Sequence, residues 1–67
     1  MNVRIEAANG RYTIYTPEQL RKDAQSTVKG IGRLLGYSLR IPPHGDPQMI
    51  VEYRTREGTN GTVTVVL

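Results

Sequence analysis

The side chains of this chain that are best suited to chemistry are those of arginine, lysine and tyrosine. Arginine binds phosphate through paired hydrogen bonds, and tyrosine rings stack on the bases of nucleic acids. Nine Lys and Arg residues outnumber six Asp and Glu residues, which gives a formal net charge of +3. This charge permits contact with nucleic acid, an anionic membrane or an acidic protein, and it is also ordinary for a soluble domain.

Two groups of basic residues are expected on separate surfaces. The first lies on the polar face of a β-sheet and consists of Arg4, Tyr15, Arg40, Glu52 and Arg54, with Arg56 at its rim. The second is a stripe along one side of the expected helix and consists of Lys22, Lys29 and Arg33. Both groups could hold phosphates or a protein partner, and both are also typical of solvated, charged faces.

His44 is the only histidine, and Asp46 lies two residues after it in a proline-rich loop. A His–Asp pair can act as general acid and base, for example in a ribonuclease. The order of a helix, Gly36-Tyr37 and a loop with histidine before a strand is similar to that of small toxins with the double-stranded-RNA-binding fold. That resemblance implies cleavage of mRNA, although the second helix and the spacing of those toxins are missing. A loop contact is the simpler interpretation of both residues.

No other pattern in the sequence indicates catalysis or a cofactor. With no cysteine and a single histidine, the chain offers no thiolate site, no histidine-rich metal site and no disulfide. A glycine-rich phosphate loop, a nucleophile elbow and paired catalytic carboxylates are also absent from the sequence. We therefore expect a non-enzymatic protein that uses no metal and no cofactor.

One amphipathic helix is predicted from Thr16 to Gly36. Thr16 is a typical N-cap, and Gly36 is a typical residue directly after a helix end. The apolar side of this helix consists of Leu20, Ala24, Thr27, Val28, Ile31, Leu34 and Leu35. Gly30 and Gly32 weaken its second half. The helix could therefore end near Lys29, or the glycines could allow a strand or a partner to approach closely.

A β-hairpin is predicted over residues 2–16. Asn9-Gly10 is the strongest signal for a two-residue turn, and a turn of this length fixes the register of the two strands. The resulting pairs are Val3 with Thr16, Arg4 with Tyr15, Ile5 with Ile14, Glu6 with Thr13 and Ala7 with Tyr12. One face of the hairpin is then apolar and the other polar, as a half-buried hairpin requires.

Three further strands are expected at 37–41, 49–55 and 62–67, separated by a loop at 42–47 and a turn at 57–61. The order β-β-α-β-β-β predicts a single small α+β domain over residues 1–67, with one antiparallel or mixed sheet and the helix packed on one face. This order resembles the β-grasp arrangement of ubiquitin-like proteins and small immunoglobulin-binding domains, which implies a central position for the last strand. A simple antiparallel sheet fits equally well. If the Val-rich last strand lies at an open edge instead of at the centre, pairing across that edge to form a homodimer is the alternative.

A cytoplasmic location is expected, because the N-terminus lacks the apolar segment of a secretion signal and no apolar run reaches transmembrane length. We predict a small binding module that engages nucleic acid or a nucleoprotein complex as a regulator or inhibitor, in the manner of accessory proteins of phages and mobile elements. The alternative is a protein-binding inhibitor or adaptor of the anti-CRISPR type, acting through its sheet face, an edge strand or the 42–47 loop. A small ribonuclease toxin is a third interpretation. No membrane or small-molecule partner is expected.

Overall fold

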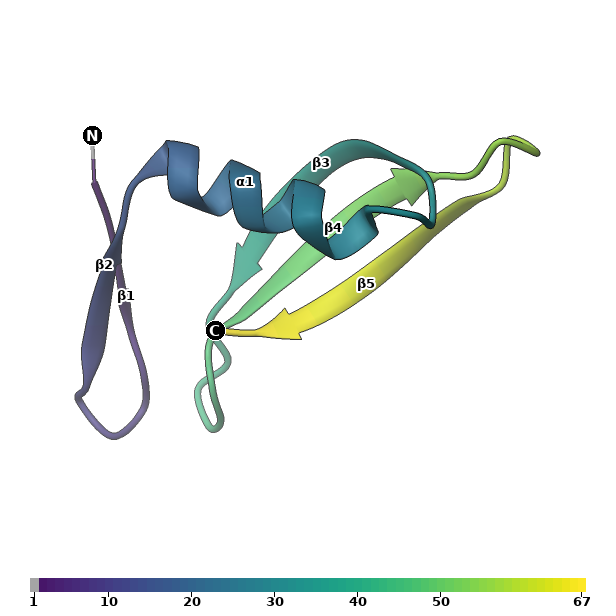
Figure 1. Ribbon diagram of the computed structural model, residues 1–67. Coiled ribbons are helices and arrows are strands. Elements are labelled where there is room, and N and C mark those ends of the chain that lie inside the picture. Colours follow the sequence, from purple (N-terminus) through teal and green to yellow (C-terminus); the bar gives the residue numbers. More distant parts are fainter. Residues whose placement is uncertain (1) are drawn as a thin grey trace.

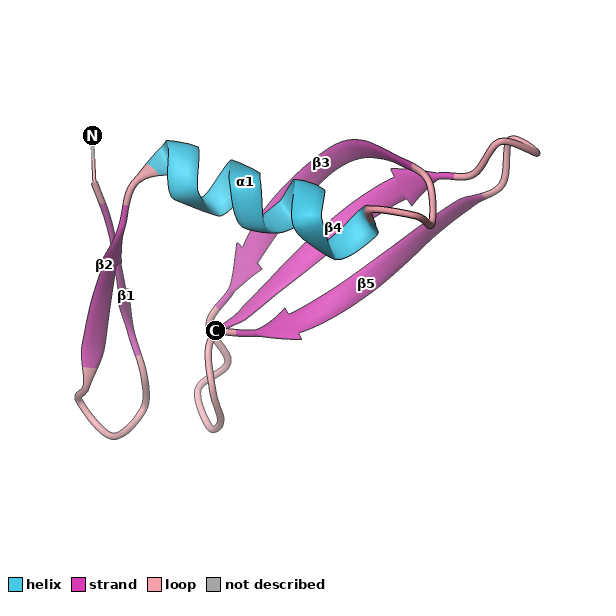
Figure 2. Cartoon of the chain, viewed as in Figure 1, coloured by secondary structure: helices cyan, strands magenta, loops and turns pink. Residues whose placement is uncertain are grey.

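The computed structural model describes residues 2–67, which form one helix and two antiparallel β-sheets (Figure 1; Figure 2). In chain order the elements are β1 (Val3–Glu6), β2 (Tyr12–Tyr15), α1 (Pro17–Val28), β3 (Arg33–Arg40), β4 (Gln48–Arg54) and β5 (Asn60–Val66). The first sheet is the β1–β2 hairpin, and the second has the strand order β3-β4-β5. The predicted α+β class and order of elements are confirmed, whereas two sheets replace the single predicted one.

Helix α1 begins where the sequence predicts. Thr16 has extended backbone angles, and its hydroxyl oxygen accepts a hydrogen bond from the Gln19 N–H group at 3.1 Å. Pro17 occupies the first turn, where its missing donor costs nothing, and Glu18 places a carboxylate near the positive end of the helix dipole. With 12 residues, α1 is too short and too polar to cross a membrane, and residues 2–67 contain no other helix that could do so.

The contribution of the Thr16 cap to the unfolding free energy should be measurable. The variant Thr16→Ala is expected to lose about 1 kcal/mol of unfolding free energy, because one N–H group of the first turn loses its acceptor. Thr16→Ser keeps the hydroxyl and is the matched control, with a loss well below that of alanine. Urea denaturation followed by circular dichroism measures both. Equal losses in the two variants would contradict a role for the hydroxyl.

Helix α1 ends at Val28, so the prediction of a helix reaching Gly36 is wrong and the shorter alternative is correct. Gly30 has a φ of +83°, a left-handed conformation that favours glycine after a helix end. The Gly32 N–H group donates to the Val28 carbonyl oxygen at 3.2 Å and closes the last turn. Residues 33–36 consequently belong to strand β3 rather than to the helix.

Helix α1 packs diagonally across β3 and β4 over a small apolar core (Figure 1). The five buried members of this core are Leu20, Ala24 and Val28 from the helix, and Met49 and Val51 from β4. Partly buried residues pack around it: Leu34, Tyr37 and Leu39 of β3, Tyr53 of β4, Leu67 after β5, and Val3 and Tyr15 of the hairpin. In the last two strands, residues 49, 51 and 53 and then 63, 65 and 67 lie on the face toward the helix.

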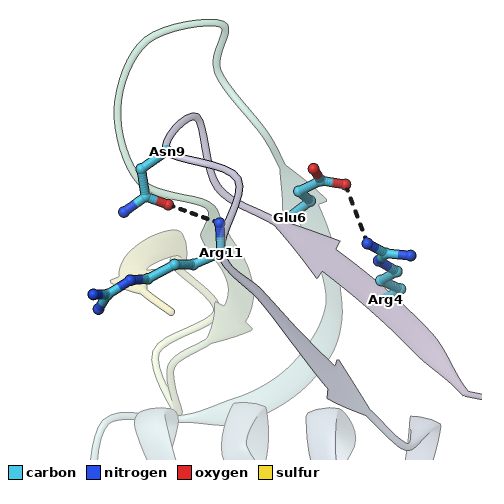
Figure 3. A network of polar contacts seen from close by, with 4 residues as sticks. All are labelled: Arg4, Glu6, Asn9 and Arg11. Atoms are coloured by element: carbon cyan, nitrogen blue, oxygen red, sulfur yellow. Dashed lines mark hydrogen bonds and ion pairs between the residues drawn. The ribbon is translucent and has the colours of Figure 1, made fainter.

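The register of the β1–β2 hairpin differs from the prediction by one residue. The Ala7 N–H group donates to the Arg11 carbonyl oxygen at 2.8 Å, so the loop has three residues rather than two. Only Gly10 in this loop has a positive φ, +85°, whereas the side-chain oxygen of Asn9 accepts from the Arg11 N–H group at 3.0 Å (Figure 3). A three-residue loop that ends in a left-handed glycine is the next most common hairpin connection. Ile5 therefore lies opposite Thr13.

This shift exchanges the two faces of β2. Tyr12 and Ile14, which were expected to face inward, are 56% and 54% exposed. Tyr15, which was expected on the polar face, is half-buried and packs against the core. On the outer side of the hairpin, the Arg4 guanidinium lies 3.7 Å from a Glu6 carboxylate oxygen (Figure 3). The same guanidinium lies 4.1 Å from the centre of the Tyr12 ring.

The hairpin forms a sheet of its own, and its strands do not pair with those of the larger sheet (Figure 1). Only Thr16 separates β2 from α1, so the hairpin is held at the start of the helix, where its buried Ile5 faces inward. Strand β5 consequently lies at an edge of the larger sheet rather than at its centre. The central position implied by the β-grasp resemblance is therefore wrong, and a simple antiparallel sheet with a covering helix is found.

Candidate nucleic-acid interface

Three exposed arginines meet at one end of the larger sheet. Arg33 begins β3, Arg54 ends β4, and Arg56 lies in the turn that follows β4. Arg33 and Arg54 are direct partners in the antiparallel register, so their Cα atoms lie side by side across two strands. Lys29, also exposed, precedes the connection from α1 to β3 and adds a fourth cation to this region.

These arginines line an open cleft of about 860 Å³. One wall is the α1–β3 connection, and the other is the end of β4 with its following turn; the lining residues are Gly30, Ile31, Gly32, Arg33, Arg54, Thr55, Arg56 and Glu57. We call this feature the arginine cleft. Its lining includes three arginines and a single acidic residue, Glu57. The cleft therefore carries a net positive charge that suits an anionic ligand.

Gly32 sets the distance between the two walls of the arginine cleft. A Cβ atom at this position would lie 2.8 Å from the Arg54 carbonyl carbon and 3.2 Å from the Thr55 Cα atom. Only a residue without a side chain allows this backbone to pass so close to the end of β4. The sequence raised a close approach at Gly30 and Gly32 as an alternative, and at Gly32 the approaching segment is this chain's own strand.

The turn after β4 is well ordered by hydrogen bonds. The Thr55 N–H group donates to the Thr59 carbonyl oxygen at 2.9 Å, and the Thr55 hydroxyl oxygen accepts from the Thr59 N–H group at 3.1 Å. Gly58 adopts a φ of +85°, and the Arg54 guanidinium lies against it. This turn holds Arg56 and Glu57 at the cleft, so the backbone that carries the arginine side chains has a fixed position.

The arginines of the cleft have no carboxylate partner within ion-pair distance. Across residues 2–67 the one ion pair joins Arg4 and Glu6 on the hairpin, with 59% and 56% of the two side chains exposed. Each guanidinium of the cleft therefore keeps its donors for water or a ligand. This is the arrangement that binds phosphate with the least competition from the protein itself.

The other predicted binding residues lie elsewhere. Arg40 is on the same outer face of the sheet but at its opposite end, paired with Gln48. Arg4 belongs to the separate hairpin, and Lys22 lies on the exposed side of α1. The predicted helical stripe is also broken, because Arg33 lies on β3 rather than on the helix. The structure thus divides the predicted residues and brings together only those around the arginine cleft.

The outer face of the larger sheet carries no aromatic ring. Tyr37 and Tyr53 pack toward the core, and so does Tyr15 of the hairpin. Tyr12 is the exposed tyrosine of residues 2–67, and Arg4 covers its ring. The expected surface of mixed Arg and Tyr is therefore absent, and the face beside the arginine cleft cannot stack bases on tyrosine.

His44 and Asp46 are both exposed in the connection between β3 and β4. Asp46 lines a small cavity of about 180 Å³ beside the hairpin, with Arg11 and Tyr12 among its neighbours. Across residues 2–67 no group of three or more His, Cys, Asp or Glu side chains is placed to hold a metal ion. The structure therefore adds no third acid or base to this pair.

Sequence reasoning did not include Thr55 or Glu57 in the candidate site. Both follow β4 directly, and their only signal is the turn sequence Thr55 to Thr59, which positions side chains at a strand end. Comparison with models of protein families, with curated proteins and with solved structures finds no match for this chain. Function must therefore be inferred from the geometry of the site.

Proposed function

We propose that this protein is a non-catalytic module that binds the phosphate backbone of nucleic acid through the arginine cleft. The observation that carries this proposal is the meeting of Arg33, Arg54 and Arg56 in one open cleft without a paired carboxylate. Guanidinium groups bind phosphates with two parallel hydrogen bonds, and clustering several of them gives affinity that does not depend on base sequence.

The proposed ligand is a duplex rather than a single strand. Proteins that bind single strands combine a basic groove with aromatic rings on which successive bases stack. The outer face of the β3-β4-β5 sheet offers no such ring. Backbone contacts without base contacts favour binding that is insensitive to sequence. A small protein that covers the phosphate backbone of a duplex in this way would serve as a regulator or inhibitor of a nucleoprotein complex, as accessory proteins of phages and mobile elements do.

Salt dependence tests the proposed function. If three phosphates are neutralised, the logarithm of the duplex binding constant should fall against the logarithm of salt concentration with a slope of about −2.7. The double variant Arg33→Gln with Arg54→Gln should reduce the size of this slope by about 1.8, because two of the three contacts are removed. Fluorescence anisotropy with labelled duplex and single-stranded probes measures both quantities.

The matched control removes the same charge from the helix. Arg21→Gln with Lys22→Gln changes two exposed cations on α1, which covers the opposite face of the sheet. This control should keep the slope of the original protein. Equal effects of the two double variants would contradict a defined site, and the absence of duplex binding at low salt would contradict the function itself.

A further inference from the structure

The two edges of the β3-β4-β5 sheet differ in how they are protected. Strand β3 has a register shift between Leu34 and Gly36 and carries an arginine at each end, Arg33 and Arg40. Bulges and charged residues are the usual devices that keep an edge strand from pairing with another chain. Strand β5 has none of them: its seven residues, NGTVTVV, include no charge and no proline, and its pairing with β4 is regular.

The sheet is also incompletely covered beside β5. Helix α1 packs on β3 and β4, so the inward side chains of Val63, Val65 and Leu67 remain only half-buried. An open groove of about 450 Å³ runs between the helix and this strand. Its lining includes apolar Met49 and Val65 and, on the helix side, polar Asp23. The open edge and the uncovered apolar side chains therefore occur on the same strand.

We propose that β5 pairs with β5 of a second copy of this chain, antiparallel and about a twofold axis at Thr64. In this register Thr64 lies opposite its counterpart, Val63 lies opposite Val65 of the second copy, and Thr62 lies opposite Val66 of the second copy. Valines then meet on the inner face and join the two half-covered grooves. The result is a six-stranded sheet with both helices on one side.

The strand is suited to itself more than to a foreign segment. Its alternation of threonine and valine places β-branched residues opposite one another on both faces, which is a favourable class of cross-strand pair. Val66, which is 61% exposed, gains a neighbour on the outer face. The core of one copy is small, with six buried apolar residues among residues 2–67, so added apolar contact is valuable to it.

Charge does not oppose the arrangement, although each chain carries a net charge of +3. Arg54 pairs in register with Asn60, four residues from Thr64. The antiparallel arrangement therefore places the two Arg54 residues eight residues apart along the strand direction, a separation of about 27 Å at ~3.4 Å per residue. That exceeds the screening length of about 8 Å at physiological salt. The two arginine clefts consequently do not repel each other appreciably.

A single cysteine tests the pairing and its register, because the chain has no cysteine of its own. Directly opposite residues have Cβ atoms about 4.5–5.5 Å apart, close enough for a disulfide after a small adjustment. Thr64→Cys should therefore give covalent dimers under mild oxidation. Ser38→Cys is the matched control, since Ser38 is also exposed and lies in the same row, opposite Ile50, but on the β3 edge.

Dimerisation of Thr64→Cys that does not exceed that of Ser38→Cys would overturn the proposal.

A second pair of variants tests the proposed β5 pairing without oxidation. Thr64→Lys and Thr64→Glu each place like charges at the twofold axis and should weaken the dimer at least about tenfold, whereas their mixture should form a heterodimer. Light scattering after gel filtration measures this. A monomeric unmodified protein at every concentration, or no effect of either variant, would also overturn it.

Discussion

The variant Gly32→Ala is expected to lose about 3 kcal/mol of unfolding free energy, at the upper end for an overpacked position. The added methyl group would meet the Arg54 carbonyl group and the Thr55 Cα atom. These neighbours are backbone atoms of a paired strand end, so they cannot rotate away as a flexible side chain would. A chain of this length has a total stability of about 3–10 kcal/mol. At the lower end of this range, a large part of the population would unfold.

Gly36→Ala is the matched control for this prediction. Gly36 also lies on β3, but a Cβ atom there would have no heavy atom within 4 Å, and its φ is not in the left-handed region. Its alanine variant should be as stable as the original protein or slightly more so, because the unfolded chain loses freedom. Urea denaturation compares the two. A stable Gly32→Ala variant would show that the two walls of the arginine cleft can separate at little cost.

Leu20→Ala is the second substitution with a large expected effect. Leu20 is 1% exposed and belongs to the buried core between α1 and the sheet. Removing its side chain loses apolar burial and leaves a cavity, which together cost 2–5 kcal/mol in typical cores. Because so few residues are buried in this protein, the core has little capacity to repack around the cavity. We expect a chain that is largely unfolded at physiological temperature.

Leu35→Ala provides the same chemical change on the surface. Leu35 is 43% exposed on β3, so its truncation should change the unfolding free energy by less than about 1 kcal/mol. Thermal denaturation followed by circular dichroism compares the two variants. Similar losses in both would mean that the contact between α1 and the sheet does not dominate the stability.

The elements that the sequence predicted well are those with local chemical signals. The N-cap Thr16 followed by Pro17 marks the start of α1, and alternation of apolar residues marks β4 and β5. The end of α1 is less certain from sequence, because Ile31, Leu34 and Leu35 continue the helical spacing. The early helix end near Lys29 was the alternative compatible with a strand at 33–36, and tertiary contacts decide between it and a helix that continues to Gly36.

The hairpin shows why register is difficult to predict. Asn9-Gly10 fits a two-residue turn, but glycine in the left-handed region also ends a three-residue loop. Asn9 satisfies the Arg11 N–H group with its side chain, so it has no need of a left-handed backbone. Because side chains alternate along a strand, the one-residue difference moved Tyr12 and Ile14 to the solvent side.

The arginine cleft was predictable only as a list of basic residues. Arg54 and Arg56 were expected near each other, but Arg33 was assigned to the far side of a helix. Its position beside Arg54 depends on where α1 ends and on the register between β3 and β4. Both are properties of long-range packing, which no short sequence pattern encodes. Charge composition therefore indicated the chemistry, and the fold determined which charges act together.

Within residues 2–67, each strand pairs only with a strand next to it in the sequence: β1 with β2, β3 with β4, and β4 with β5. In such a topology each strand pair closes only a short connection, so the entropic cost of closing a loop is small for each hairpin. Individual hairpins form within about 1–10 μs. The slower event should be the docking of α1 onto the β3-β4-β5 sheet, which assembles the core. The unpaired edge of β5 is therefore exposed in a partly folded chain only briefly, which limits aggregation of the chain during folding.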